Sequence, residues 1–445
     1  MKSSRRSFIK KTAVASSGII AAPTIVSSSV FGANDRINAA VLGIHGRGKS
    51  HIQSLMELDN VRVATLCDPD MNLLTAQQKT FKEKYGSNVK LEQDLRRVYD
   101  DKDIDVVTIA TPNHWHALAM IWACQAGKDV YVEKPGSHNI REGRKMIEAA
   151  EKYDRIVQHG VQLRSSPAVN EAIGLLRDGY IGRVYMARGL VFRWRESIGD
   201  AGTSPVPEGI DYDLWTGPAE KRPFTRNLVH YNWHWNWPYG NGDVGNQGIH
   251  ETDLCMWGLD VGLPTKITSM GGKYLWDDAK ETPETLTSTY NYPEENKIIQ
   301  FEVRPWCTNT EEGVTVGNIF YGEKGILVVD GYDKYKTYMG QDRTPGQSGD
   351  DGGEAATGME RGAGGTTGHF ANFIEAVRKH DKSILNGPVE TAHLASGLAH
   401  LGNIAYRTGR VLEFDPKTEN FVNDPEADKY LTRDYREGFE VPENV

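Results

Sequence analysis

The sequence predicts an α/β protein in which a doubly wound parallel sheet is followed by an α+β region with a large, mainly antiparallel sheet. Two observations support this fold class. From residue 37 to residue 161, short apolar runs alternate with helical stretches, which is the pattern of parallel strands joined by crossover helices. After about residue 164 the segments become β-rich and alternate between apolar and polar residues, which is typical of antiparallel strands with one buried face.

The first region contains five apolar runs that we expect to be strands. The first four are each followed by a stretch with helical periodicity, and parallel strands connected in this way take right-handed crossovers. The expected strands cover residues 37–44, 61–68, 105–112, 129–135 and 155–161, and the expected helices cover residues 46–58, 71–85, 114–127 and 141–153.

The second region contains segments that we expect to form the antiparallel sheet. A glycine-rich segment at 340–368 is predicted to be a long loop, because its composition cannot bury a core. Helices are expected at 369–380 and 391–410. We therefore assign residues 34–163 to the first domain and residues 164–445 to the second. The expected strands of the second domain cover residues 183–192, 265–274, 285–292, 296–304 and 326–332.

The first 33 residues resemble a twin-arginine secretion signal. Residues 4–10 read SRRSFIK, in which Arg5 and Arg6 precede Phe8. The weakly apolar run that follows, from Thr12 to Val26, is too short for a membrane-spanning helix, which needs about 20 residues. The resemblance implies export of the folded protein, to the periplasm or beyond, with an uncleaved anchor as the alternative. We expect no membrane span after the signal.

The formal charge argues against a nucleic-acid partner. The chain carries −9, and residues 1–33 hold five Lys or Arg and no acid, so the remainder carries −14. A protein of this charge repels a phosphate backbone. The four cysteines, Cys67, Cys124, Cys255 and Cys307, lie in apolar contexts without a CxxC spacing, so we expect buried thiols rather than disulfides.

A glycine-rich turn follows the first expected strand and reads Gly43-Ile-His45-Gly46-Arg47-Gly48. A dinucleotide-binding turn needs glycines for the tight turn, for close approach of the pyrophosphate and for helix packing. Gly43 and Gly48 take the first and third places, whereas His45 takes the second and Gly46 lies one residue later. Although the match is imperfect, its position between a strand and a helix favours a dinucleotide site over a plain turn.

An acidic residue ends the second expected strand. Asp68 lies 25 residues after Gly43, where a carboxylate can bind both ribose hydroxyls and would repel a 2′-phosphate. This position favours NAD over NADP. Ligands of such sheets bind beyond the carboxyl ends of the strands, so Thr111, Asn113 and His116 are expected near the nicotinamide half. For His116, a hydrogen bond within the start of its helix is the alternative.

The strand expected at 129–135 ends in the charged pair Glu133-Lys134, followed by Pro135. Two solvated charges in a turn would be the simplest explanation. However, this strand belongs to a sheet that binds a nucleotide beyond its carboxyl edge. We therefore expect Lys134 to face the cofactor crevice, with Glu133 beside it.

Three motifs of the chain belong together: TPNHWHA at 111–117, EKP at 133–135 and a later helix start that bears glycine and histidine. Together they resemble the glucose–fructose oxidoreductase and inositol dehydrogenase (Gfo/Idh/MocA) family. The resemblance spans nearly all of the chain after the signal, and EKP is its most specific part. It implies a Rossmann domain, a substrate domain and NAD-dependent redox chemistry. In that family the lysine lies beside the reacting carbon and the nicotinamide, a role that would fall to Lys134. Residues after the last strand, here Gln162 and Arg164, line the nicotinamide and substrate, with a surface arginine as the alternative for Arg164.

The second family motif is NQGIHETD at 246–253, where the family pattern is Asp-x-Gly-x-His-x-x-Asp with the first acid and the histidine near the substrate hydroxyl. His250 matches, but Asn246 replaces the acid and cannot hold a negative charge near it. We therefore expect His250 to be the main base, assisted by Glu251 or Asp243, and Asn246 to hydrogen-bond the sugar. Asn246 and His250 share one face if the stretch is a single helix.

A tryptophan-rich segment, NWHWNWPY at 232–239, directly precedes this motif. Aromatic rings stack on the apolar faces of sugars, while amide and imidazole groups bind hydroxyls. We therefore expect Trp233, His234 and Trp235 to contact a sugar. The spacing of Trp233, Trp235 and Trp237 would place all three on one face of a strand. A core strand beside a loop is the alternative.

Together these features predict an exported NAD-dependent oxidoreductase, with tightly bound cofactor, that acts on a hydroxyl of a sugar or glycoside. Oxidation at C3 would give a 3-keto-glycoside prepared for elimination, although no residue selects that carbon. One alternative is a glycosidase like those of family 109, which use NAD transiently, and another is a non-catalytic NAD-binding protein. We expect a homo-oligomer, either a dimer or a tetramer, formed through the C-terminal sheet, and no metal site.

Overall fold

The computed structural model describes residues 36–305, 309–352 and 363–445. The chain separates into two units, Met1–Arg36 and Ile37–Val445, and the fold is that of the second. The twin-arginine segment expected at 1–33 lies outside the described residues. Within the described ranges, no helix combines the length and the apolar character needed to cross a membrane.

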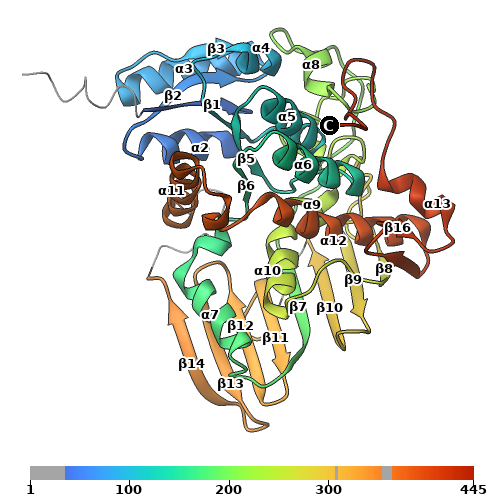
Figure 1. Cartoon of the computed structure of the whole chain (residues 1–445). Coiled ribbons are helices and arrows are strands. Elements are labelled where there is room, and N and C mark those ends of the chain that lie inside the picture. The colour runs from blue at the N-terminus through green and yellow to red at the C-terminus, as the bar shows by residue number, and fades with distance from the viewer. Residues whose placement is uncertain (1–35, 306–308, 353–362) are drawn as a thin grey trace, which may run out of the picture. The chain divides into compact units, whose positions relative to one another are not determined.

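A six-stranded parallel sheet forms the amino-terminal domain (Figure 1). Its strand order is β3-β2-β1-β4-β5-β6, so the order reverses between β1 and β4, where ligands of such sheets bind. This confirms the predicted doubly wound sheet. Its strands are β1 (Ile37–Leu42), β2 (Val61–Cys67), β3 (Lys90–Glu92), β4 (Val106–Ile109), β5 (Asp129–Glu133) and β6 (Val157–Gly160).

Helices cover both faces of the parallel sheet, and each face has its own apolar core. One core contains side chains from α4 (Leu95–Asp100), α5 (Asn113–Gln125) and α6 (Ile140–Lys152). The other contains side chains from α2 (Arg47–Met56), α3 (Met71–Tyr85) and α11 (Ala363–Lys379). Because α11 comes from the second half of the chain, the two halves are interleaved.

The second domain is built on a ten-stranded sheet with the order β14-β13-β12-β11-β7-β10-β9-β8-β15-β16. Among its described strand pairs, β7 and β10 run parallel and the others antiparallel, which confirms the predicted mainly antiparallel sheet. Its strands are β7 (Val184–Phe192), β8 (Lys266–Gly272), β9 (Thr285–Tyr292), β10 (Lys297–Arg304), β11 (Val316–Gly322), β12 (Gly325–Asp330), β13 (Lys334–Met339), β14 (Thr344–Asp350), β15 (Leu412–Asp415) and β16 (Asn420–Phe421).

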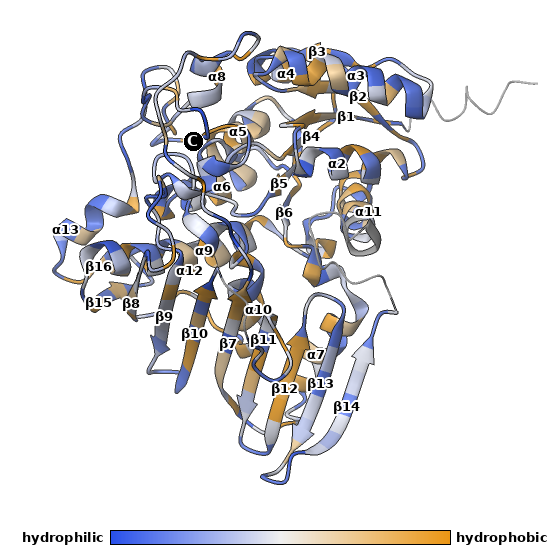
Figure 2. Ribbon diagram, turned by 180° about the vertical axis from the view of Figure 1, so that it is seen from behind, coloured by the Kyte–Doolittle hydropathy of each residue, from blue (hydrophilic) through white to orange (hydrophobic). Residues whose placement is uncertain are grey.

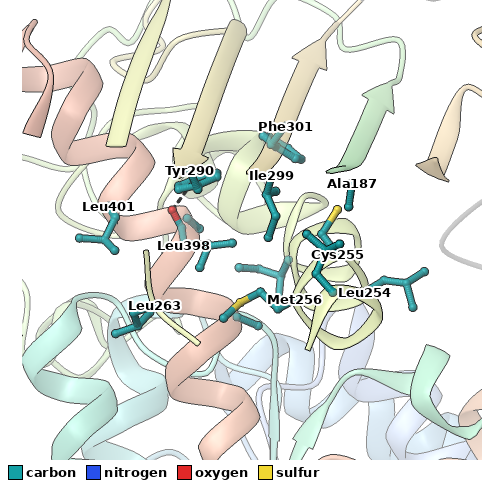
Figure 3. Packing of buried hydrophobic residues seen from close by; sticks show 14 of the residues in the cluster. Ala187, Leu254, Cys255, Met256, Leu263, Tyr290, Ile299, Phe301, Leu398 and Leu401 are labelled. Carbon is teal, nitrogen blue, oxygen red and sulfur yellow. Dashed lines mark hydrogen bonds between the residues drawn. The ribbon is translucent and has the colours of Figure 1, made fainter. Parts of the chain in front are cut away.

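One face of this sheet packs on α7 (Pro167–Arg177), α10 (Ile249–Leu259) and α12 (Val389–Thr408). Figure 3 shows Phe301 and Tyr290 of the sheet near side chains of α10 and α12, and the Tyr290 hydroxyl donates to the Leu398 carbonyl at 2.8 Å. α12 lies between the two sheets (Figure 1) and contacts both α6 and β8. This apolar core therefore fixes one domain against the other.

The prediction of a continuous loop at 340–368 was wrong, because β14 occupies Thr344–Asp350 and α11 begins at Ala363. β14 is an edge strand that pairs with β13 through its backbone, so it needs few apolar side chains. Figure 2 shows the contrast between apolar β12 and polar β14. The Asp351 carboxylate then accepts from the Ser166 hydroxyl and the Ala168 N–H, both at 2.7 Å.

The described cysteines, Cys67, Cys124 and Cys255, are buried free thiols, as the apolar contexts predicted. Cys307 lies outside the described residues.

Candidate active site

A cleft of about 1130 Å³ lies between the carboxyl edge of the parallel sheet and the second domain. Its walls come from the turns after β1, β2, β4 and β5, from the chain after β7, and from α9 (Gly242–Asn246) and the start of α10. A further wall comes from residues 198–240, which we call the strap. Pockets for one small molecule usually measure roughly 300–1,000 Å³, so this cleft has room for a cofactor and a second ligand.

The glycine turn after β1 has the backbone that a dinucleotide requires. Gly43 has φ +80°, and a Cβ there would lie 2.6 Å from the Ala110 carbonyl oxygen. A Cβ on Gly48 would lie 1.9 Å from the Gly43 carbonyl oxygen, so Gly48 permits α2 to pack closely on the turn. Gly46 has open space around its Cβ position and lies on the cleft wall with His45 and Arg47.

Asp68, at the end of β2, is hydrogen-bonded to this turn. Its carboxylate accepts from the Ile44 N–H at 3.0 Å and the Asp70 N–H at 3.1 Å. Burial raises the pKa of Asp68, and these two hydrogen bonds act in the opposite direction. The glycine turn and a carboxylate on the cleft wall after β2 are the donor and acceptor set that a dinucleotide needs, so these residues fit NAD.

The strap lies against the loop between β2 and α3. The Met71 N–H donates to the Gly209 carbonyl at 3.0 Å, and the Asp211 N–H donates to the Pro69 carbonyl at 2.9 Å. His230 of the strap contacts Asp70 at 3.0 Å and stacks on His45 of the glycine turn, with ring centroids 4.8 Å apart. The strap therefore spans from the second domain to the cofactor turn.

The strap also has a small apolar core of its own. It contains α8 (Tyr212–Thr216) and a 3₁₀ turn at Asn232–Trp235. Its rings pack with one another and against α5, where the His114 Nε2 lies 3.0 Å from the Trp215 carbonyl oxygen. The buried strap residues in this cluster are Tyr212, Trp215, Ala219, Phe224, Leu228, Trp233 and Tyr239.

Glu133 organises a buried polar network at the end of β5. Its carboxylate is paired with Arg47 at 2.8 Å, contacts His51 at 3.2 Å and accepts from Gln162 at 3.0 Å. Burial acts to raise the pKa of Glu133, but the charge of Arg47 and the contact with His51 hold it well below its usual range. Glu133 therefore remains a carboxylate beside Lys134.

Lys134 lies on the cleft wall, and its ammonium donates to the backbone carbonyl of Asn246. Burial lowers the pKa of Lys134 to about 8, although the Glu133 carboxylate opposes the shift. A lysine with this pKa exchanges its proton near neutral pH, as a general acid or base must.

Asn246 and His250 both line the cleft, but they do not lie on one continuous helix. Asn246 ends α9 and His250 lies in the first turn of α10. Burial and the nearby charge of Lys134 lower the pKa of His250 to about 3, so its imidazole is neutral. The Asn246 amide donates to the Tyr231 hydroxyl and to Asp243, both at 3.3 Å, which fixes its orientation.

Family models match both halves of the chain. The model for the "Oxidoreductase family, NAD-binding Rossmann fold" matches residues 37–161, and the model for the "Oxidoreductase family, C-terminal alpha/beta domain" matches residues 181–300 and 365–441. The chain belongs to the Gfo/Idh/MocA oxidoreductase family. Its parallel-sheet domain is therefore an NAD-binding Rossmann domain, which confirms the predicted family and cofactor.

Curated relatives are similar over part of their length. A levoglucosan dehydrogenase from Pseudarthrobacter phenanthrenivorans is 35% identical over 24% of this chain and 31% of its own. A glycosyl hydrolase family 109 protein from Shewanella pealeana is 28% identical over 34% and 38%, and an inositol 2-dehydrogenase from Salmonella typhimurium is 28% identical over 34% and 45%. The chain thus matches less than half the length of each of these relatives.

Several solved structures share the fold of nearly the whole described chain. An oxidoreductase domain protein from Kribbella flavida aligns with a TM-score of 0.65 and 17% identity, covering 85% of this chain and 99% of its own. A levoglucosan dehydrogenase in complex with NADH and levoglucosan aligns with a TM-score of 0.64 and 18% identity over 85% and 99%. At this identity the likeness establishes a common architecture.

Two residues expected to bind substrate lie away from the cleft wall. Arg164 donates two hydrogen bonds of 2.8 Å to Asp253, and its guanidinium lies 4.7 Å from the Trp257 ring centroid. The Arg164 guanidinium is therefore paired with the Asp253 carboxylate rather than directed toward a ligand. Glu251 is 1% exposed and lies behind His250, and burial raises its pKa to about 8, so it does not contact a ligand in the cleft directly.

The expected strand at the tryptophan-rich segment is instead the 3₁₀ turn Asn232–Trp235, because Trp233 packs into the strap core. The three tryptophans therefore do not share one strand face. Trp233 and His234 line the cleft and stack on each other, with ring centroids 3.6 Å apart. Trp235 is buried beneath Arg195, whose guanidinium lies 6.0 Å from its ring centroid, and does not line the cleft.

The remaining residues expected near the cofactor, Thr111, Asn113, His116 and Gln162, all lie on the cleft wall. His116 is held by the Thr111 carbonyl at 2.8 Å and the Pro135 carbonyl at 2.6 Å. The contact with Thr111 is a hydrogen bond at the start of the helix, which was the alternative to contact with the nicotinamide. Because both ring nitrogens contact backbone carbonyls, His116 supports the wall of the cleft.

Several residues of the cleft wall were not predicted from the sequence, including Arg193, Arg195, Tyr231 and Tyr332. Arg193 and Arg195 are two residues apart and continue the alternation of β7 beyond its end. This strand-like period of two could have predicted that both side chains lie on the same face. Tyr231 and Tyr332 come from irregular segments with no comparable signal. Among the described residues, no group of three or more His, Cys, Asp or Glu side chains is arranged to hold a metal ion.

Proposed function

We propose that the protein is an NAD-dependent oxidoreductase that acts on a hydroxyl group of a sugar or glycoside. The observation that carries this proposal is the presence on one cleft, beside the glycine turn, of Lys134 with a pKa of about 8 and a neutral His250. Bound NAD supplies the hydride acceptor for the carbon that carries the hydroxyl. The relatives named levoglucosan dehydrogenase and inositol 2-dehydrogenase support a sugar or polyol substrate.

Lys134 and His250 divide the handling of the hydroxyl proton. His250 is neutral, with its pKa lowered to about 3 by burial, so it accepts a hydrogen bond from the hydroxyl and orients it. Lys134 has the pKa closer to neutral pH, about 8, and takes the proton in its neutral form. The resulting ammonium is stabilised by the Asn246 carbonyl and the Glu133 carboxylate. This division differs from the sequence-based expectation, in which His250 is the main base.

The test is a screen of sugars and methyl glycosides against the purified protein. The expected result is an absorbance rise from reduced nicotinamide with at least one compound, together with a ketosugar identified by mass spectrometry. We propose C3 as the first carbon to examine, because a 3-keto-glycoside is prepared for elimination. Absence of reduced cofactor and of ketosugar across the panel would reject the oxidoreductase proposal.

A glycosidase that uses NAD transiently is the second candidate, supported by the similarity to the family 109 protein from Shewanella pealeana. The two candidates start from the same oxidation at the cleft but differ in products. A hydrolase releases a free sugar from a glycoside and leaves the cofactor as it began. Quantifying free sugar and NADH in the same reaction separates the two.

We further propose that the protein is exported and retains its cofactor. The arginine pair at Arg5 and Arg6 supports export of a folded protein. The strap supports retention, because His230 and the backbone of Gly209 lie against the loop that carries Asp70 and Met71. Cell fractionation of the full-length protein, with and without Arg5→Lys and Arg6→Lys together, tests export.

Finally, we propose a homo-oligomer formed through the face of the ten-stranded sheet that lies opposite α10. A second apolar cluster on β7, β11 and β12 supports this proposal. It contains Leu190, Ile319 and Val328, and its Tyr321 and Ile326 are only partly buried, so a partner could cover them. Light scattering after gel filtration tests it, and a monomer at micromolar concentration would reject it.

A further inference from the structure

Two arginines reach the substrate end of the cleft by continuing the alternation of β7. Gly189 and Val191 of β7 lie on the face that packs against the helices, and the next residues of this alternation are Arg193 and Arg195. Both line the cleft, whereas Trp194 between them is 45% exposed. The Arg193 N–H donates to the Arg304 carbonyl at 3.1 Å, which holds the extension to the end of β10.

The charge of Arg195 is neutralised within the protein. Its guanidinium binds both oxygens of Asp243, with contacts of 2.8–3.2 Å, and also donates to the Tyr231 hydroxyl at 3.2 Å. Lys134 lies beside the Glu133 carboxylate, whose charge offsets its own, and its ammonium donates to the Asn246 carbonyl. Each of these two cations therefore has a carboxylate that offsets its charge.

Arg193 differs from both. Its Nη1 donates to the Gln247 side-chain oxygen at 2.8 Å, and the Gln247 amide in turn donates to the Tyr332 hydroxyl. Among the described residues, no carboxylate lies within 4.0 Å of its guanidinium nitrogens, and its Nε and Nη2 have no acceptor. A neutral amide thus orients the guanidinium without compensating its charge.

The nearby acids do not supply the missing charge. Glu251 is buried behind His250, and burial raises its pKa to about 8, so it carries a proton at neutral pH. Asp351 lies on the cleft wall, but its oxygens accept from Ser166 and the Ala168 N–H and no ion pair joins it to Arg193. Asp243 feels the charge of Arg193, but its carboxylate is paired with Arg195. An uncompensated arginine in a partly desolvated cleft is costly unless a ligand brings the counter-charge.

We propose that Arg193 binds a carboxylate of the substrate, and therefore that the substrate class is an acidic sugar, such as a hexuronic acid or its glycoside. The planar guanidinium matches the two oxygens of a carboxylate. A phosphate dianion would meet one uncompensated cation, whereas a carboxylate carries the single charge that Arg193 leaves unpaired. This inference rests on the proposed function and names the substrate class for the same site.

The test is a calorimetric titration of the NAD-loaded protein with D-glucuronate, D-galacturonate, D-glucose, D-galactose and glucose 6-phosphate. We expect at least one uronate to bind about tenfold or more tightly than its neutral counterpart, with an affinity that falls as salt rises. Arg193→Met should weaken that uronate about 10- to 100-fold, the usual loss for a charge-assisted hydrogen bond, and change the neutral sugar less than threefold. Arg193→Lys should retain part of the affinity.

Arg183→Met is the matched control, because Arg183 begins the same segment but forms an exposed pair with Glu323 and should leave every affinity unchanged. Glu251→Gln tests the competing counter-ion. If Glu251 were ionised and compensated Arg193, this variant would strengthen uronate binding about tenfold and overturn the inference. Uronates that bind no better than neutral sugars, a preference for glucose 6-phosphate over the uronates, or an Arg193→Met loss shared equally by neutral sugars would also overturn it.

The titration separates this inference from the proposed function, because binding needs no turnover. If a uronate binds through Arg193 while no sugar reduces the cofactor, the substrate class stands and the redox function fails. If neutral sugars reduce the cofactor while uronates neither bind nor react, the redox function stands and the role of Arg193 is rejected.

Discussion

Lys134 is the residue on which the proposed chemistry depends most directly. Lys134→Met removes the proton acceptor while keeping a long apolar side chain at a buried site. We expect hydride transfer to fall by at least ~10²-fold, with the fold and the bound NAD retained, because the glycine turn and Asp68 do not rely on Lys134. Single-turnover absorbance and the nucleotide content of the denatured protein measure the two effects.

Lys266→Met is the control for that experiment, since Lys266 is exposed on β8 and pairs with the exposed Glu413. It should behave as the unmodified protein. Turnover near normal in Lys134→Met would reject the catalytic role, whereas loss of nucleotide would assign Lys134 to cofactor binding.

The pH dependence follows from the same residue. The pKa of Lys134 is lowered to about 8 by burial, and the proton acceptor is the neutral amine. The oxidation rate should therefore rise about tenfold per pH unit below pH 8 and level off above it, while reduction of the ketosugar should decline above pH 8. His250 titrates at about 3, outside a pH 5–10 profile. If the oxidation rate of Lys134→Met still rose about tenfold per pH unit below pH 8, this assignment would be wrong.

We propose that Asp68 governs the choice of cofactor. Asp68→Ala should weaken NAD by roughly 1–3 kcal/mol, the scale of a lost hydrogen bond to a charged group, and should reduce the discrimination against NADP. Asp68→Asn is the comparison, because it removes the charge and keeps one oxygen acceptor for either the Ile44 or the Asp70 N–H group, which bind different oxygens of Asp68. If the denatured protein releases NADP, the assignment of Asp68 is wrong.

At the residue scale, sequence reasoning succeeded where a residue type is tied to a backbone position. Gly43 and Gly48 are required by φ and by close packing, and Lys134 follows from its place at the end of a parallel strand. It failed for Arg164 and Trp235, whose partners, Asp253 and Arg195, are distant in sequence. A side chain that is satisfied by a remote partner cannot be distinguished, from sequence, from one that is free to bind a ligand.

Among the elements, the strap lies against the glycine turn and the loop after β2, so we expect it to help retain the cofactor. His230→Ala removes its contact with Asp70 and its stacking on His45. A hydrogen bond and a ring stack contribute about 1–2 kcal/mol together, so we expect NAD to dissociate about tenfold faster. Stopped-flow displacement of bound NADH by excess NAD measures the rate.

Lys221→Ala is the control within the strap, because Lys221 pairs with Asp213 in an exposed salt bridge of the kind that contributes little. Equal dissociation rates in His230→Ala and Lys221→Ala would show that the strap does not hold the cofactor through His230.

The elements that sequence patterns predicted are those with a strong apolar period. The five longer strands of the parallel sheet and their helices have such a period, whereas β3 has three residues and none to detect. β14 was missed for a different reason, since its stability comes from backbone pairing with β13 rather than from buried side chains. Composition predicts which segments can bury a core, and it does not predict edge strands.

For the whole molecule, the proposed export and cofactor binding impose a common constraint. Outside the cytoplasm there is no NAD pool to draw on, so an exported enzyme that released NADH after each turnover would stop. The Rossmann domain, the strap and the second domain together enclose one cleft of about 1130 Å³, large enough for the cofactor to stay while substrates exchange. We therefore expect the hydride to pass from one bound sugar to a second acceptor without release of the cofactor.

This expectation predicts ping-pong kinetics and a nucleotide that survives purification. Retention through dilution requires a dissociation constant well below micromolar, or more than ~8 kcal/mol of binding free energy. The protein should be purified without added nucleotide and gel-filtered at low concentration, and NAD should then be measured per chain. Near-stoichiometric NAD, with parallel lines when sugar and acceptor are varied, is the expected result. A mostly empty protein that needs millimolar NAD for turnover would contradict retention and weaken the case for export, because the two rest on the same supply of cofactor.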